Sequence, residues 1–112
     1  MTPRLLLEPQ AEAEFLEAGR WYAERNAAIA AAFRTSVEHT LLAVERAPHQ
    51  FRIALRDIRK ALVRRFPYVV YYVVLSDVIS VIAVGLCPGG HRTAFTARCA
   101  DGTVARSLSA IR

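Results

Sequence analysis

The stretch RKALVRRFPYVVYYVVLSDVISVIAVGL, from Arg59 to Leu86, contains the longest apolar runs in the chain and decides its fold. Valine, isoleucine and tyrosine dominate two runs, 69–75 and 78–84, which a Ser-Asp pair separates. Branched and aromatic side chains pack well on a pleated sheet, and two such runs around a polar break predict a β-hairpin. Neither run alternates between apolar and polar residues. We therefore expect both strands to be covered on both faces or to lie in the middle of the sheet.

The residues before this hairpin predict two helices joined by a tight turn. The first runs from Pro9 to Arg25, and the second from Ala27 to Ala47. Each has an apolar stripe at helical spacing. The stripe residues are Ala11, Phe15, Ala18 and Tyr22 in the first helix, and Ile29, Phe33, Val37, Leu41 and Val44 in the second. Asn26 leaves so short a break that the helices must run antiparallel, and the small alanines of the second helix allow close helix–helix approach.

Three further segments complete the predicted fold. A short strand occupies residues 4–8, a connector at 49–56 contains a short strand or a turn, and a basic strand covers 57–66. Runs of helices followed by runs of strands indicate an α+β fold rather than alternating α/β. We expect the N-terminal strand and the helical hairpin to pack on one face of a small antiparallel β-sheet. The other face then binds a partner or stays exposed.

A chain of 112 residues is predicted to form one domain, and we place that domain at residues 1–98. The tail 99–112 has no strong period, so it is expected to be poorly ordered or a short terminal helix. No apolar run reaches the roughly 18 residues that cross a bilayer, and the N-terminus lacks the pattern of a signal peptide. The expected location is the cytoplasm.

The net charge of +5 is unevenly distributed along the chain. Residues 1–50 carry five arginines and seven glutamates, whereas residues 51–112 carry nine arginines, one lysine and three aspartates. The sheet half is therefore the basic half. A basic field attracts nucleic acid, phosphate or an acidic protein, although the same charges also occur on ordinary solvated faces.

Particular residues, taken with this order of elements, resemble the RelE/ParE superfamily of type II toxin–antitoxin toxins, and the ParE branch (plasmid-stabilisation toxins) in particular. The most specific is the run Arg65-Phe66-Pro67-Tyr68 that leads into the apolar hairpin. The other matching residues are Ala11 to Glu17, Trp21, Tyr22, Asn26, Ala30, Phe33, Pro48 and Arg59. The resemblance covers residues 4–86.

The resemblance implies a RelE/ParE-like fold and a growth-inhibiting toxin that needs no cofactor. By likeness to the ParE branch, the expected target is DNA gyrase, inhibited by binding rather than by catalysis, and the expected neutralising partner is a ParD-like antitoxin. Two alternatives remain. One is a RelE-like ribosome-dependent mRNA endoribonuclease. The other is an inactive relic that acts only as a binding partner, because the sequence after Leu86 departs from the usual ending of the family.

The resemblance and the basic field together give the candidate site residues. Those expected to bind an antitoxin or target are Arg59, Arg64, Arg65, Tyr68, Arg92 and Arg98. The catalytic candidates under the ribonuclease alternative are Arg59, Lys60, Arg65, His91 and Arg92. Exposed tyrosines at 68, 71 and 72 could stack on bases, but core packing is the favoured reading. The set Cys87, His91 and Cys99 matches no zinc module, so we expect no metal site and two free cysteines.

Overall fold

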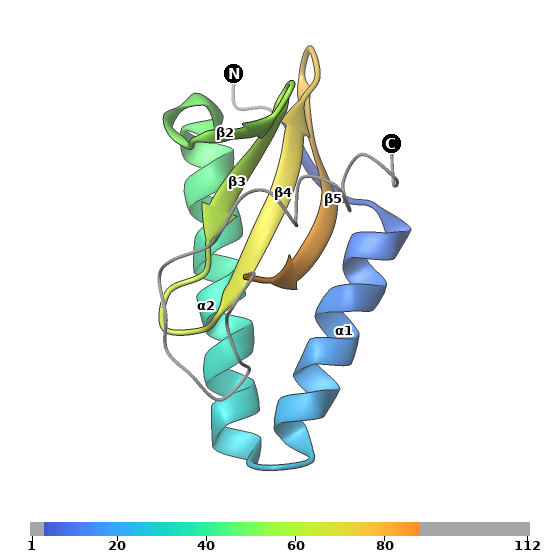
Figure 1. The fold of residues 1–112 in the computed structure, drawn as a ribbon, viewed down its shortest axis with the longest axis vertical. Coiled ribbons are helices and arrows are strands. Elements are labelled where there is room, and N and C mark those ends of the chain that lie inside the picture. Colours follow the sequence, from blue (N-terminus) through green and yellow to red (C-terminus); the bar gives the residue numbers. More distant parts are fainter. Residues whose placement is uncertain (1–3, 88–112) are drawn as a thin grey trace.

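The computed structural model of the chain describes residues 4–87. Within this range, helices and strands form two layers, with the helices on one side of a five-stranded sheet (Figure 1). In chain order the elements are β1 (Arg4–Leu7), α1 (Pro9–Ala23), α2 (Ala27–Arg46), the 3-10 helix η1 (Pro48–Gln50), β2 (Ile53–Leu55), β3 (Ile58–Leu62), β4 (Tyr68–Val74) and β5 (Val78–Leu86). The predicted α+β class is confirmed.

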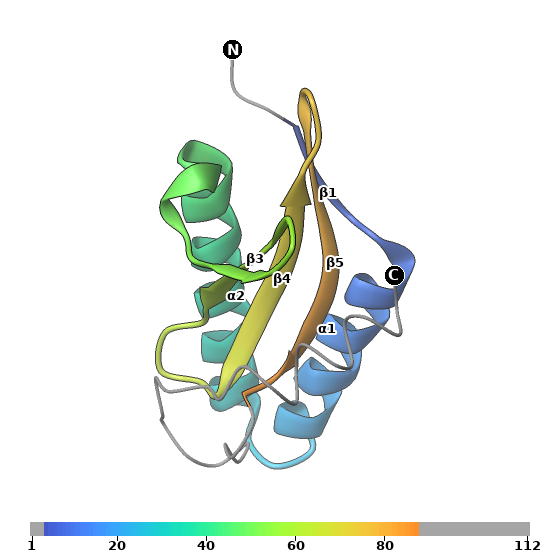
Figure 2. The same ribbon diagram turned by 45° about the horizontal axis from the view of Figure 1, so that its top comes forward.

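The sheet has the strand order β1-β5-β4-β3-β2. Each pair from β2 to β5 is antiparallel, and β1 pairs parallel to β5, with Leu7 opposite Val81. Both helices and three other strands lie between β1 and β5 in the chain, which gives the long connection that a parallel pair requires. The N-terminal strand therefore belongs to the sheet, at the edge opposite β2 (Figure 2).

The β4–β5 hairpin forms the centre of the sheet, as its apolar runs predict. Residues 68–73 of β4 are buried on both faces, which confirms the expected cover on both sides. The register shifts by one residue between Tyr71 and Tyr72. Such a bulge increases local twist, and it allows a long hairpin to bend around the helices.

The helices begin and end close to their predicted positions, and local chemistry explains why. Pro9 occupies the first turn of α1, where its missing N–H costs no hydrogen bond. Asn26 caps α2: its side-chain oxygen accepts hydrogen bonds from the backbone N–H groups of Ala28 and Ile29, at 2.8 and 3.2 Å. These bonds satisfy two of the donors that a helix start leaves free. The turn is therefore fixed, and α1 and α2 pack antiparallel.

An aromatic cluster joins the helices to the sheet. Phe33 of α2 is fully buried at its centre, with its ring 5.1 Å from that of Tyr22 and 5.3 Å from that of Phe66. Tyr68 of β4 lies 5.1 Å from Phe33 on the sheet side. Tilted and edge-on contacts at these distances add to the free energy of burial. The cluster therefore anchors the start of β4 beneath the helical hairpin.

The structure differs from the sequence-based expectation in α2 and at the end of β3. Ile29 is 44% exposed and lies outside the apolar stripe of α2, where Thr40 is buried instead. The connector forms the short strand β2, which is one of its two predicted forms. The strand expected at 57–66 ends at Leu62, because the chain must turn so that the Phe66 ring can enter the aromatic cluster.

Candidate functional site

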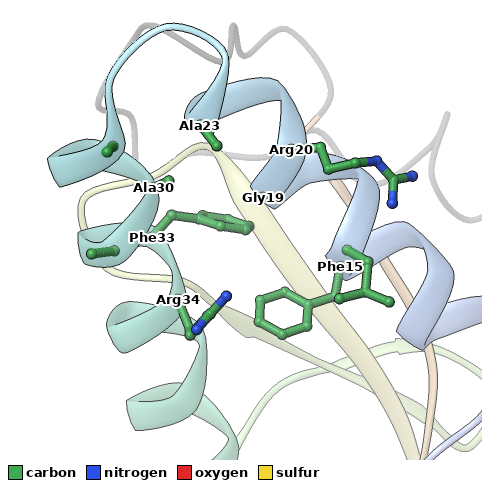
Figure 3. A pocket seen from close by; sticks show the side chains of 10 residues that line it. Phe15, Gly19, Arg20, Ala23, Ala30, Phe33 and Arg34 are labelled. Carbon is green, nitrogen blue, oxygen red and sulfur yellow. The ribbon is translucent and has the colours of Figure 1, made fainter.

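A groove opens between α1 and α2 on the helical layer (Figure 3). We call it the helical groove; its volume is about 380 Å³. The lining residues are Phe15, Leu16, Gly19, Arg20, Ala23, Ala27, Ala30, Ala31, Phe33 and Arg34. Small residues leave the space, because a methyl group placed at Gly19 would have no neighbour within 4 Å. The alanines of α2 therefore help to line a cavity near the turn, rather than only allowing close approach.

The walls of the helical groove are apolar and its mouth is basic. The rings of Phe15 and Phe33 face into it, with centroids 5.8 Å apart (Figure 3). Arg34 projects over it from α2, whereas Arg20, which also lines the groove, extends its guanidinium outward from α1 (Figure 3). Both arginines are exposed. An apolar hollow flanked by guanidinium groups suits a large apolar side chain with carboxylates beside it. Sequence reasoning missed this site, although the pairs Gly19/Ala23 and Ala27/Ala31 at four-residue spacing signal it.

A second candidate surface lies at the opposite side of the sheet from β1. We call it the basic edge; it consists of Arg52, Arg56, Arg64 and Arg65, in the segments that flank β2 and β3. All four side chains are exposed. Within residues 4–87 none of their guanidinium groups forms a hydrogen bond or an ion pair. The ion pair described in this range joins Arg25 to Glu24. Arg64 and Arg65, two of the candidate binding residues, thus lie at the surface.

Arg59 has an internal role instead. Its guanidinium donates hydrogen bonds to the backbone oxygens of His49 and Phe51, at 3.3 and 2.7 Å. The hydroxyl of Tyr72 donates to the backbone oxygen of Pro48, next to the same segment. Burial raises the pKa of Tyr72 to about 12, and the positive charge of Arg59 lowers it in part. Arg59 and Tyr72 thus hold the segment after α2 against the sheet.

Tyr68, another candidate binding residue, lies in the core of the protein rather than on a surface. Only 3% of its surface is exposed, because the ring packs between Phe33 and Tyr22 in the aromatic cluster. Tyr71 and Tyr72 are also buried, so none of the three offers a ring face for stacking on a base. Lys60 of β3 is half-buried, opposite Tyr71. His91, Arg92, Arg98 and the tail 99–112 lie outside the described residues.

The described part of the chain brings together no group of three metal-ligating side chains. Cys87 is buried and disulfide-bonded, which corrects the expectation of a free thiol. Among residues 4–87 there is no helix with the length and apolar character that a membrane span requires.

Comparisons with known proteins place these surfaces in context. A family model described as "ParE toxin of type II toxin-antitoxin system, parDE" matches residues 5–86. A chain in a solved structure titled "Chromosomal ParDE TA system from P. aeruginosa" superposes with a TM-score of 0.68 at 12% sequence identity. The match covers 76% of this chain and 96% of that chain. No curated protein matches in sequence.

At this low identity, the structural match establishes the fold alone. The family model is the stronger finding, because its match runs from within β1 to the end of β5 and so covers the elements of the described part of the chain. The residues that carry the resemblance, Arg65 to Tyr68 before the central hairpin, lie within it. The chain belongs to the ParE family of toxins from type II toxin–antitoxin systems.

Proposed function

We propose that this chain inhibits growth in the bacterial cytoplasm by binding DNA gyrase, and that a ParD-like antitoxin neutralises it. Membership of the ParE family is the observation that carries the proposal. The proposed mode of action is binding. In support, Arg59, a candidate for catalysis, donates its hydrogen bonds to two backbone carbonyls.

The helical groove is the proposed antitoxin site. Its apolar walls would take one or more large side chains from an amphipathic segment, as grooves for helical peptides do. Carboxylates of that segment would pair with Arg20 and Arg34 at the mouth. An acidic segment of this kind, disordered when free, orders itself on binding by burying its apolar face.

Expression in a bacterial host tests the toxin assignment. Inducing the chain alone should arrest growth, and coexpressing the antitoxin encoded beside it should restore growth. Normal growth despite soluble expression would refute the assignment. Purified protein should also inhibit supercoiling by gyrase, and lack of inhibition would remove gyrase as the target. If primer extension instead revealed mRNA cuts positioned by codon, the chain would be a ribonuclease of the RelE type.

A matched pair of substitutions at Gly19 tests the groove. Gly19→Leu should fill it without a backbone clash, whereas Gly19→Ala leaves most of it open. Losing one buried apolar side chain of the partner, about 1.5–3 kcal/mol, weakens antitoxin binding by roughly 10- to 100-fold. The affinity of Gly19→Ala should stay close to that of the unsubstituted chain. Equal affinity of the leucine variant would place the antitoxin elsewhere.

A further inference from the structure

Two arginines of the basic edge adopt left-handed backbone conformations. Arg56 has φ of 53° and Arg65 has φ of 70°, and they are the described non-glycine residues with positive φ. A side chain makes this conformation strained, whereas glycine adopts it freely. Arg56 opens the two-residue connection between β2 and β3, where Leu55 pairs with Ile58. Glycine is a preferred residue at such positions. Backbone geometry alone therefore favours glycine at both sites.

The fold explains why the backbone turns at Arg65, but it does not explain why the residue at this turn is an arginine. The next residue, Phe66, is buried with its ring 5.3 Å from both Tyr22 and Phe33. The loop must reverse sharply to insert that ring. The Arg65 side chain itself is exposed and forms no hydrogen bond or ion pair within the described residues. The backbone strain at Arg65 is therefore not explained by a structural contact of its side chain. Such strain indicates that the side chain has a function at the surface.

The cations of the basic edge are spread along one line. Arg56 precedes β3 and Arg64 follows it, so the length of the strand, about 13 Å over the four steps from Ile58 to Leu62, lies between them. Arg52 lies between these ends, because its backbone oxygen accepts a hydrogen bond from the backbone N–H of Lys60 at 2.9 Å. From residue 47 to residue 76 the sequence has six basic residues and a single acidic one, Asp57. The edge therefore presents a row of positive charge.

We propose that the basic edge binds the phosphate backbone of duplex DNA without reading its sequence. Arginine matches phosphate geometry, and a row of cations along an edge suits a polymer that carries a charge on every unit. Single-stranded nucleic acid would be expected to stack its bases on exposed aromatic rings. Tyr68, Tyr71 and Tyr72 are all buried, so the sheet offers no such platform among its described tyrosines.

An acidic protein is the competing partner for this edge. Protein partners gain most of their affinity from aromatic or large apolar side chains seated in pockets. Neither Arg56 nor Arg65 lines either of the two described grooves, one between α1 and α2 and one beside β5. Ile53 and Leu62 are exposed near the edge, but isolated exposed apolar residues are common on protein surfaces. These observations favour the polyanion.

Fluorescence anisotropy with a labelled duplex of about 20 base pairs tests the proposal, using chain made by cell-free synthesis. Four phosphate contacts predict a slope of about −3.6 for log K against log salt, an affinity loss of about 150-fold from 50 to 200 mM. The double variant Arg56→Gly/Arg65→Gly should lower the slope to about −1.8, which is a loss of about 12-fold over the same range. Its urea midpoint should equal or exceed that of the unsubstituted chain, because glycine relieves the strain.

The control is Arg20→Ala/Arg34→Ala, which removes the same net charge from the helical groove and should keep the slope near −3.6. Arg52→Gln/Arg64→Gln, which leaves both left-handed positions intact, should lower the slope as the glycine variant does. An unchanged slope in either edge variant, or an equal loss in the control, would overturn the proposal. So would tighter binding of a single strand of the same length, or equal competition by polyglutamate. Growth arrest and antitoxin binding are measured separately, so this test stands apart from the toxin assignment.

Discussion

Replacing Tyr72 with phenylalanine tests how the segment after α2 is held to the sheet. The Tyr72 side chain is fully buried in β4, and its hydroxyl donates a hydrogen bond to the backbone oxygen of Pro48, 24 residues earlier. The Phe51 ring lies edge-on to the Tyr72 ring with centroids 6.2 Å apart. Phenylalanine preserves the ring and this packing. The substitution therefore isolates the hydroxyl.

At neutral pH the substitution should destabilise the protein. It removes one buried hydrogen bond and leaves the Pro48 oxygen without this donor, which costs about 1.5 kcal/mol of unfolding free energy. The urea midpoint should fall, while the dependence of the free energy on urea concentration should not change, because the surface exposed on unfolding stays the same. Tyr72→Phe should keep the far-ultraviolet circular dichroism spectrum of the unsubstituted chain.

The difference between the two proteins should shrink at alkaline pH. Burial raises the pKa of Tyr72 to about 12 in the folded state, whereas an unfolded tyrosine titrates near its ordinary value of about 10. The contribution of Tyr72 to stability is thus complete below pH 10 and is lost as the pH rises towards 12. Linkage gives a loss of about 1.4 kcal/mol at pH 11, which nearly cancels the hydrogen-bond contribution.

Urea unfolding of both proteins at pH 8, 9, 10 and 11 measures this effect. The unfolding free energies should differ by about 1.5 kcal/mol up to pH 9 and converge near pH 11. Other tyrosines and the arginines are common to both proteins, so their titration cancels in the difference. A difference that stays constant from pH 8 to pH 11 would refute the reasoning, since it would mean that Tyr72 titrates alike in both states.

Three further predictions follow from single contacts, each measured by urea unfolding. Asn26→Ala should destabilise the protein by about 1 kcal/mol because it removes the cap of α2, and Asn26→Ser should restore most of the loss; equal stability of the alanine variant would discount the cap. Phe33→Ala should cost about 3–5 kcal/mol by emptying the centre of the aromatic cluster, so a cost below 1 kcal/mol would contradict the assigned packing. Gly19→Ala should stabilise α1 by about 0.5–1 kcal/mol, since open space surrounds the position; a decrease would mean that its surroundings are tighter than described.

The helical hairpin and the central strands could be predicted because their signals are local. Pro9 marks the start of α1 because it lacks a backbone N–H, and Asn26 marks the start of α2 because its side chain accepts hydrogen bonds there. The apolar runs around Ser76 and Asp77 predict a hairpin without reference to the rest of the chain. The edge strands are different. β1 and β2 are four and three residues long, and their place depends on pairing with distant partners. Sequence pattern alone leaves that pairing open.

The roles of individual site residues were harder to predict, because they depend on contacts that the sequence does not bring together. Arg59 and Arg65 are both basic and close in sequence, yet one bonds to carbonyls eight and ten residues away and the other is exposed. The sequence favours a core position for the Tyr68 ring but leaves a surface position open, and only the packing of Phe33 from α2 against this ring decides between them. The helical groove exists because Gly19 and the alanines that line it have side chains too small to fill the space between the helices.

The helical groove and the basic edge share no residue, but they meet at one contact. Phe33 lines the groove, and its ring packs on Phe66, the residue after Arg65. A substitution at Phe33 would therefore disturb both surfaces and could not distinguish antitoxin binding from DNA binding. Gly19 lies on α1, on the other wall of the groove. Loss of antitoxin affinity in Gly19→Leu, together with an unchanged salt slope for DNA, would separate the two surfaces. The converse pattern in Arg56→Gly/Arg65→Gly would complete the separation, because those positions lie outside the groove.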